Sequence, residues 1–379
     1  MLRMPEIIGQ DKVLKMINAA IKTGKIGQAY LFHGPEGVGK LTTAFFFARA
    51  INCLTQDNEL KPCERCKSCQ KIKNFVHPDM LFYFPIPKFK AFDNENSAGS
   101  GNSKSENEKW DLYQAYYKLK QKSPWQDYQF DKTVGIHIEQ IRTIQKELLM
   151  MPYEGKYRIC IMENFDLITI QAANAFLKTL EEPPPNTIFI LTVNNLNKLL
   201  PTILSRCILI EFFPLGIELI EKYLIDQRNC EQAKAKLFSR LASGSPKKAL
   251  LLSENEDLPD LKIFFEFLEL TVEHQDLSFL HWLELYFAAN TQHQLRINEL
   301  LLYLEIWLND LLLYVYQPER ITFIHQEALL LKYINKNPFY LDSVLRLVNA
   351  MEEYKQKISG NVNQKLVLSQ VYLDLINVF

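Results

Sequence analysis

Residues 34–40 combine glycines and a lysine in a spacing that binds phosphate. In the pattern G-x-x-x-x-G-K-[ST], backbone N–H groups surround phosphate oxygens, the lysine reaches the β- and γ-phosphates, and a hydroxyl ligates Mg²⁺. An apolar run precedes the segment and a periodic apolar run follows it, so we expect a strand and a helix on either side. The sequence therefore predicts a nucleotide-binding loop, with candidate residues Gly34, Gly37, Gly39 and Lys40.

Two positions indicate that this loop has lost the groups needed for hydrolysis. Leu41 stands where the metal-binding hydroxyl belongs, and Thr42 would lie about 100° further around a helix. An NTPase also places Asp for Mg²⁺ and Glu for the attacking water at the end of a buried strand. Here that strand ends in Glu163 and Asn164, and an amide cannot accept a proton from water. The sequence leaves open whether the loop binds ATP or ADP, and we expect no hydrolysis.

Glu163 itself has two interpretations. As the residue at the metal position, it joins the candidate nucleotide site. As an ordinary strand-end carboxylate it binds no metal, because one carboxylate without its usual partners holds Mg²⁺ weakly. Both interpretations stay open at this point.

Four of the seven cysteines form a candidate metal site. They follow the predicted helix closely, and three of them have the spacing C-x2-C-x2-C. In a protein of reducing compartments such a cluster indicates metal binding before disulfides. Four thiolates suit tetrahedral Zn²⁺ and leave no open position for catalysis. The sequence predicts a structural zinc site formed by Cys53, Cys63, Cys66 and Cys69.

Two basic residues are candidates for phosphate contacts. Arg206 precedes an apolar run, at a place where ring ATPases carry an arginine that reaches a neighbouring subunit's γ-phosphate. An arginine before a strand is more often a surface or salt-bridge residue. Lys247 follows Ser245 and Pro246, which indicate the N-cap and first turn of a helix. It is either a phosphate contact or a solvated lysine.

Composition excludes several classes of protein. The formal net charge is −1, so no global basic field marks a stand-alone nucleic-acid binder. No apolar run reaches the ~18 residues typical of a membrane span, and the first residues lack a signal-peptide pattern. We therefore expect a cytoplasmic protein with no membrane partner.

Apolar runs alternate with helical patterns up to about residue 215, and helical patterns continue to the end. This order predicts an α/β plus all-α protein with a mostly parallel sheet. We expect three domains: an α/β domain, a small helical domain and a larger helical domain. Their predicted bounds are 1–215, 216–257 and 258–379, with a zinc module at 53–75 and a polar insertion at 86–132.

The insertion has two parts. Residues 93–109 are polar and of low complexity, which predicts a loop. Residues 110–128 are rich in aromatic side chains and predict a helix. The sequence assigns no function to either part.

Several ordered motifs resemble the clamp-loader branch of the AAA+ ATPases. The resemblance covers about residues 5–250 outside the insertion, and residues 361–366 more loosely. The segments that carry it are Ile8-Gly9-Gln10, Tyr30 to Pro35 with the glycine loop, the cysteine module, His77-Pro-Asp79, Ile138 to Arg142, Ala172 to Pro183, Leu200 to Cys207, and Gly244-Ser245.

This resemblance implies a P-loop AAA+ domain, a small helical lid and a C-terminal helical collar that mediates oligomerisation. It implies a pentameric ATPase that places a sliding clamp on primed DNA, with gamma/tau motor subunits and a delta subunit as partners. Leu41, Glu163 and Asn164 depart from the motor pattern toward a stator subunit of the DNA polymerase III holoenzyme. Such a subunit supplies Arg206 in trans to its neighbour's ATP and has no hydrolysis cycle of its own.

Two alternatives differ in class. An active gamma/tau-type motor needs a hydroxyl at position 41 and a carboxylate at position 164, and the sequence has neither. A zinc-dependent DNA-binding protein unrelated to ATP would be expected to show a basic bias, which is missing.

Overall fold

The computed structural model describes residues 7–55, 62–88, 102–122, 125–128, 130, 134–254, 259–288, 297–317, 321–323, 340–359 and 362–377. The chain divides into two compact units. The first consists of Met1–Tyr223 and Ala242–Leu251, and the second of Leu224–Leu241 and Leu252–Phe379. The three-domain division at residues 215 and 257 stays a prediction.

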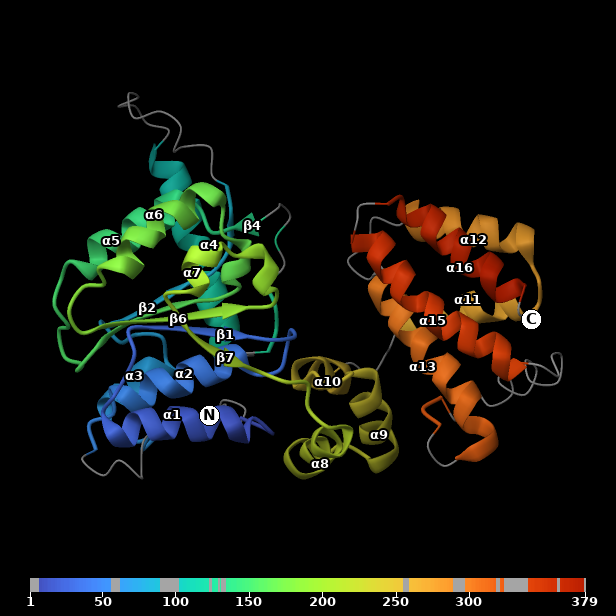
Figure 1. The fold of residues 1–379 in the computed structure, drawn as a ribbon, viewed down its shortest axis with the longest axis horizontal. Helices are drawn as coiled ribbons and strands as arrows, with labels where there is room; N and C mark the ends of the chain where they lie inside the picture. Colours follow the sequence, from blue (N-terminus) through green and yellow to red (C-terminus); the bar gives the residue numbers. More distant parts are fainter. Residues whose placement is uncertain are drawn as a thin grey trace. The chain divides into compact units, whose positions relative to one another are not determined.

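A five-stranded parallel sheet forms the centre of the first unit (Figure 1). Its strand order is β2-β5-β6-β1-β7, so the first strand lies between the last two in the chain. Strand β6 is buried along its whole length, as expected for a parallel sheet that is covered on both faces. The strands are β1 (Ala29–His33), β2 (Met80–Tyr83), β5 (Arg158–Met162), β6 (Thr187–Val193) and β7 (Ile208–Glu211).

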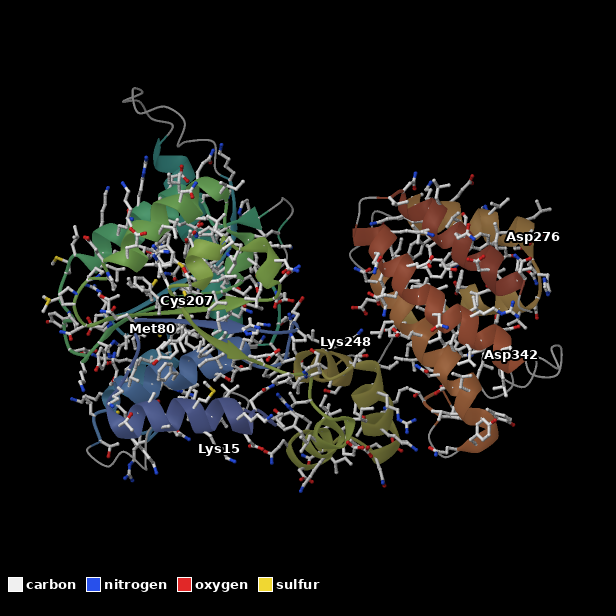
Figure 2. The ribbon with its side chains drawn as sticks, viewed as in Figure 1. Lys15, Met80, Cys207, Lys248, Asp276 and Asp342 are labelled. Atoms are coloured by element: carbon white, nitrogen blue, oxygen red, sulfur yellow. The ribbon has the colours of Figure 1, made fainter. Side chains whose placement is uncertain are left out.

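Helices cover both faces of this sheet (Figure 1). One face carries α1 (Asp11–Thr23), α2 (Lys40–Ile51) and α3 (Lys67–Lys73), and the other carries α5 (Ile138–Leu148), α6 (Ile170–Glu181) and α7 (Pro201–Leu204). Side chains fill the space on either side (Figure 2). Along β1, Phe32 belongs to one apolar core and Leu31 to the other, because successive strand residues point to opposite faces.

The sheet gathers the candidate residues at one edge. In a parallel sheet the carboxyl ends of the strands lie at the same edge, where ligands bind. The glycine loop follows β1 and leads into α2, Glu163 follows β5, and Asn194 follows β6. The predicted fold class, an α/β domain with a mostly parallel sheet and a glycine loop between strand and helix, followed by helices, is confirmed.

A short ribbon closes the base of the insertion. Strand β3 (Ile86–Pro87) pairs antiparallel with β4 (Val134–Gly135), so the two ends of the insertion lie beside each other. Helix α4 (Asn102–Lys122) lies between them in the chain.

The predicted bounds of the insertion helix were wrong at both ends. Helix α4 begins at Asn102, so residues 102–109 are helical and do not form the predicted loop. Residues 93–101 lie outside the described residues. Adding turns to an existing helix costs little, and Lys and Glu are good helix formers. The helix ends at Lys122 rather than Tyr128, since Pro124 disfavours helical backbone at the residue before it.

After residue 216, the secondary structure within the described ranges consists of helices. They are α8 (Ile217–Arg228), α9 (Gln232–Leu241), α10 (Pro246–Glu254), α11 (Pro259–Val272), α12 (Asp276–Ala288), α13 (Ile297–Tyr316), α15 (Tyr340–Ser359) and α16 (Gln364–Ile376). The second unit has its own core around the fully buried Trp307 of α13 and Phe264 of α11. The predicted boundary at residue 257 lies outside the described residues. Among the described helices, none combines the length and apolar character that a membrane crossing requires.

Candidate functional site

The glycine loop has the backbone conformation that its sequence predicts. Gly34, Gly37 and Gly39 all have positive φ, at 142°, 78° and 101°, a region that side chains with a Cβ rarely adopt. A Cβ on Gly37 would lie 2.1 Å from the Ser245 hydroxyl oxygen and 2.9 Å from the Lys247 Cβ. Glycine is therefore required where the start of α10 approaches the loop.

Lys40 is held by the loop itself. Its side chain is almost fully buried, and its Nζ donates to the backbone oxygens of Gly34, at 2.7 Å, and Pro35, and to Asn194 Oδ1 at 2.8 Å. Burial lowers the pKa of Lys40 to about 8. The ammonium that would reach a phosphate is thus turned toward protein oxygens.

Two amides, Asn164 and Asn194, lie at the strand ends beside Glu163. Asn164 has positive φ, at 49°, and its Oδ1 accepts from Asn194 Nδ2 at 3.2 Å. Asn194 links Asn164 to Lys40. The sequence analysis missed Asn194, although a polar residue directly after the buried run 187–193 was a usable signal, because that strand ends beside the loop.

Lys247 lies beside the glycine loop, at the N-terminal end of α10. The Ser245 hydroxyl accepts from the Lys248 backbone N–H at 3.3 Å, which confirms the predicted N-cap. The Lys247 backbone N–H donates to Gly37 O at 3.2 Å, and its Nζ forms ion pairs with Glu36, at 2.7 Å, and Asp127. Burial lowers the pKa of Lys247, but the two carboxylates outweigh it and raise this pKa overall.

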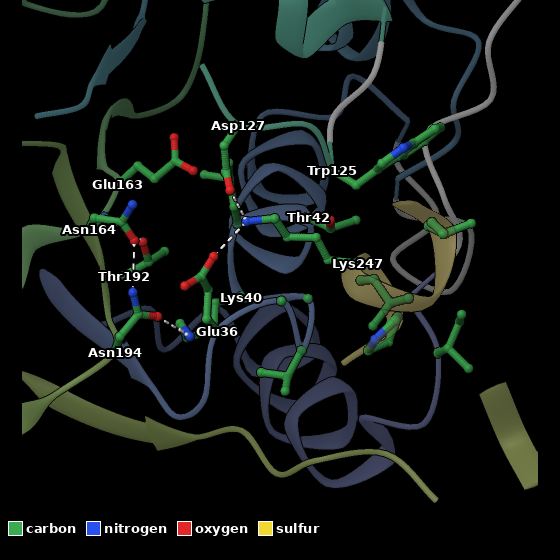
Figure 3. A pocket seen from close by; sticks show the side chains of 18 of the residues that line it. Glu36, Lys40, Thr42, Trp125, Asp127, Glu163, Asn164, Thr192, Asn194 and Lys247 are labelled. Atoms are coloured by element: carbon green, nitrogen blue, oxygen red, sulfur yellow. Dashed lines mark hydrogen bonds and ion pairs between the residues drawn. The ribbon is translucent and has the colours of Figure 1, made fainter. Parts of the chain in front are cut away.

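A pocket of about 110 Å³ lies between these groups (Figure 3). The residues that line it include Gly37, Gly39, Lys40, Glu163, Asn164, Asn194 and Lys247, whereas Gly34 of the loop is not among them. Leu41 also lines it and packs against the neighbouring apolar core. The insertion contributes three further lining residues, Lys120, Trp125 and Asp127. No sequence pattern had connected them to the site, since only the fold brings them there.

The four candidate cysteines lie together at the end of α2 and the start of α3. All four sulfurs are within 4.8 Å of one another. Backbone N–H groups of Cys63, Cys66 and Cys69 each donate to a sulfur of the cluster at 3.4 Å. The Arg65 backbone N–H is the main cause that lowers the pKa of Cys63 to about 6. A cluster of this kind can hold a metal ion.

Arg206 follows α7 and does not line the pocket of its own chain. Its side chain is about one-third exposed, and its guanidinium forms an ion pair with Glu181 of α6 at 2.7 Å. It also donates to Thr202 O at 2.8 Å. The sequence left open a surface salt bridge and a phosphate contact, and within the isolated chain the salt bridge is formed.

Comparisons with known proteins connect these features. The curated protein DNA polymerase III subunit delta' of Bacillus subtilis is 25% identical over 377 residues, which cover 97% of this chain and 96% of that protein. DNA polymerase III subunit tau of the same organism is 27% identical over 255 residues, 66% of this chain but only 37% of tau. A solved structure of a DNA polymerase III gamma subunit-related protein from Thermotoga maritima is 16% identical, with a TM-score of 0.37, over 96% of this chain and 98% of that one.

The family model described as DNA polymerase III, delta subunit, matches residues 9–216. This range holds the glycine loop, the cysteine cluster, the insertion and Arg206. It covers more than half of the 379 residues. The chain therefore belongs to the DNA polymerase III delta subunit family.

Proposed function

We propose that this chain is a delta'-like stator subunit of a replicative clamp loader. It helps to load the sliding clamp on primed DNA, in a hetero-oligomer with gamma/tau motor subunits and a delta subunit. The observation that carries the proposal is a P-loop site with Leu41, Asn164 and a buried, internally bonded Lys40. Such a site has the scaffold of an ATPase without its hydrolytic groups.

In this proposal Arg206 acts in trans on the ATP of a neighbouring subunit. It is partly exposed and outside its own pocket, and its partner Glu181 is half exposed. Ion pairs of this kind contribute little stability, so the guanidinium can leave Glu181 for a phosphate at low cost. A planar guanidinium matches a phosphoryl group in two hydrogen bonds.

The cysteine cluster is proposed to hold structural zinc. The donor set consists of four thiols within 4.8 Å of one another, and N–H groups directed at sulfur favour the thiolate form that zinc needs. Zinc there would connect the end of α2 to the start of α3 and perform no chemistry.

The helical parts are proposed as a lid (216–257) and an oligomerisation collar (258–379). Exposed leucines of α12 and α16 support the collar. These helices are neighbours, since Phe279 and Tyr372 stack with ring centroids 3.7 Å apart. Leu277, Leu280, Leu366 and Leu373 are each more than half exposed, and exposed apolar patches mark protein interfaces.

ATP turnover of the chain alone and of a reconstituted clamp-loader complex tests the proposal. We expect the isolated chain to be inert and Lys40→Ala to leave the complex unchanged. Arg206→Ala is expected to slow hydrolysis at the single neighbouring site by roughly 10³-fold, so the rate of the complex falls by that site's share. Arg206→Lys should behave like Ala, because an ammonium lacks the planar fork. Lys198→Ala, which removes an exposed charge, is the control.

The opposite result identifies the second candidate, an active gamma/tau-type motor. In that case the isolated chain hydrolyses ATP and Lys40→Ala abolishes the activity. The candidate is favoured only by the retained glycines and Lys40.

A further inference from the structure

The insertion places charged side chains at both ends of the P-loop pocket. Five residues form a line in which charge alternates: Glu163, Lys120, Asp127, Lys247 and Glu36. Neighbours in the line are ion pairs of 2.5–4.0 Å. Lys120 and Asp127 belong to the insertion, whereas the other three belong to the scaffold of the site. Figure 3 shows Asp127 and Glu36 on either side of the Lys247 side chain.

At one end, the insertion satisfies the carboxylate at the metal position. Lys120 Nζ lies 3.2 Å from Glu163 Oε1, and the Tyr116 hydroxyl donates to Glu163 Oε2. All three side chains are more than nine-tenths buried. A buried carboxylate needs a counter-charge, and here an ammonium provides the positive charge that a metal ion would otherwise bring.

At the other end, the insertion supplies an anion to the cation of α10. The Asp127 carboxylate pairs with Lys247 Nζ, which also contacts Glu36. The Lys247 side chain is 18% exposed, whereas that of Asp127 is 58% exposed. A carboxylate thus occupies the partner position that a nucleotide phosphate would take.

The insertion helix is firmly anchored to the sheet. The Tyr116 ring stacks on Phe84 with centroids 3.6 Å apart and planes within 9° of each other. The Tyr117 hydroxyl donates to Phe82 O at 2.9 Å. Both contacts lie at or just beyond the end of β2, where the site forms. The charged residues of α4 are therefore held in place by a packed aromatic face.

The space that remains is small. The pocket measures about 110 Å³, whereas small-molecule sites usually have roughly 300–1,000 Å³. Trp125 of the insertion forms part of the wall. On this geometry a nucleotide would have to displace Lys120, Trp125 and Asp127 in order to enter.

We propose that the insertion acts in cis as an internal substitute for magnesium–nucleotide: Lys120 takes the place of the metal at Glu163, Asp127 takes the place of a phosphate at Lys247, and nucleotide is thereby excluded. This inference does not rest on the clamp-loader role. It concerns binding by the isolated chain, and it holds or fails whatever Arg206 does in a complex.

The test is the binding of a fluorescent ATP analogue to the full-length chain, followed by anisotropy with and without Mg²⁺. We expect weak or undetectable binding to the wild type. The variant Lys120→Ala/Asp127→Ala should bind at least about tenfold more tightly, since the apparent affinity of a site scales with the fraction of molecules in which it is open. Asp127→Ala alone should give a smaller gain, because only Lys247 is released.

The matched control is Asp111→Ala/Lys118→Ala. Both residues are exposed on the same helix, and the variant has the same change in charge, so its binding should equal that of the wild type. If the wild type binds as tightly as the double variant, or if neither Asp127→Ala nor the double variant gains affinity, the proposal is wrong. Thermal melting checks folding; should the double variant unfold, Asp127→Ala decides alone, because its side chain is largely exposed.

Discussion

Lys40 illustrates how one residue can keep its position in a motif while its environment changes its chemistry. Its ammonium is buried and bonded to two backbone oxygens and an amide. Desolvation disfavours the charged form, and the pKa of Lys40 falls from 10.5 to about 8. Lys40 is therefore a buried cation, and its desolvation lowers the stability of the native state.

This cost predicts a pH dependence of stability. As pH rises above about 8 the native state releases the Lys40 proton, while the unfolded state keeps it up to about 10.5. The unfolded state then binds more protons, so stability rises with pH in this window. Urea unfolding across it should show the free energy of unfolding rising by on the order of 1–3 kcal/mol more in the wild type than in Lys40→Met. Equal slopes for the two proteins would contradict the prediction.

A second prediction concerns Asp79, which is fully buried before β2. Its carboxylate accepts the backbone N–H groups of Tyr153, Glu154 and Gly155 at 2.6–2.8 Å. Burial raises the pKa of Asp79, but these bonds outweigh it and lower the pKa overall. Asp79→Asn should cost about 2–4 kcal/mol at neutral pH, because an amide cannot accept all three N–H groups.

The stability contributed by Asp79 is present above its unfolded pKa of 3.8. It is lost as pH falls through the lower native pKa. The difference between Asp79→Asn and the wild type, measured by urea unfolding, should therefore shrink at strongly acidic pH. A difference that stays constant with pH would indicate a packing effect instead.

At the scale of secondary-structure elements, a short helix depends for its stability on the contacts that link it to its neighbours. Helix α3 has only seven residues, and the sulfur of Cys66, at its N-cap, accepts from the Cys69 backbone N–H. Helices this short are marginal on their own. The cysteine cluster links α3 to the end of α2, so the proposed zinc would stabilise an element that the chain alone holds weakly.

Metal analysis and melting check this point. We expect one zinc per chain in the wild type and none in Cys66→Ser, whose melting temperature should be several degrees lower. A strong chelator should lower the melting temperature of the wild type to a similar value. Cys230→Ser, outside the cluster, is the control. A wild type without zinc, or a chelator without effect, would refute the structural zinc.

Elements determined by local pattern could be predicted, and those determined by distant contacts could not. The strand before the glycine loop, Ala29–His33, was predicted because its apolar run ends directly at that loop. The approach of Lys120 and Asp127 to the pocket was missed, since it depends on aromatic packing against β2 across the insertion. The ion pair of Arg206, which follows α7, with Glu181 at the end of α6 likewise joins residues that no sequence spacing relates.

For the whole molecule, the proposed collar in the second unit can be tested through the exposed leucines of two neighbouring helices. Leu277 of α12 is 83% exposed and Leu373 of α16 is 52% exposed, although both helices pack into the same core. Replacing an exposed leucine changes the stability of an isolated chain little. In a complex, the same replacement costs much more binding free energy if a partner covers that leucine.

Replacing both leucines should therefore weaken assembly without unfolding the chain. Leu277→Ser/Leu373→Ser is expected to keep the wild-type melting temperature and to lower incorporation into the reconstituted complex by roughly tenfold or more. Size-exclusion chromatography with quantified subunits measures this. Glu352→Ala, at an exposed position of α15, should assemble normally. Full incorporation of the double variant would place the collar interface elsewhere.

The β3–β4 ribbon has a consequence for how such a chain varies between genes. Ile86 pairs with Gly135, so the segment between them begins and ends at neighbouring positions of the domain. Adding or removing it requires one event at one locus and leaves the order of the five strands unchanged. If the insertion excludes nucleotide as proposed, access to the phosphate loop can differ between related genes while the fold that carries the loop stays the same. The length of the segment between these two residues would then indicate, in any related gene, whether that loop is open.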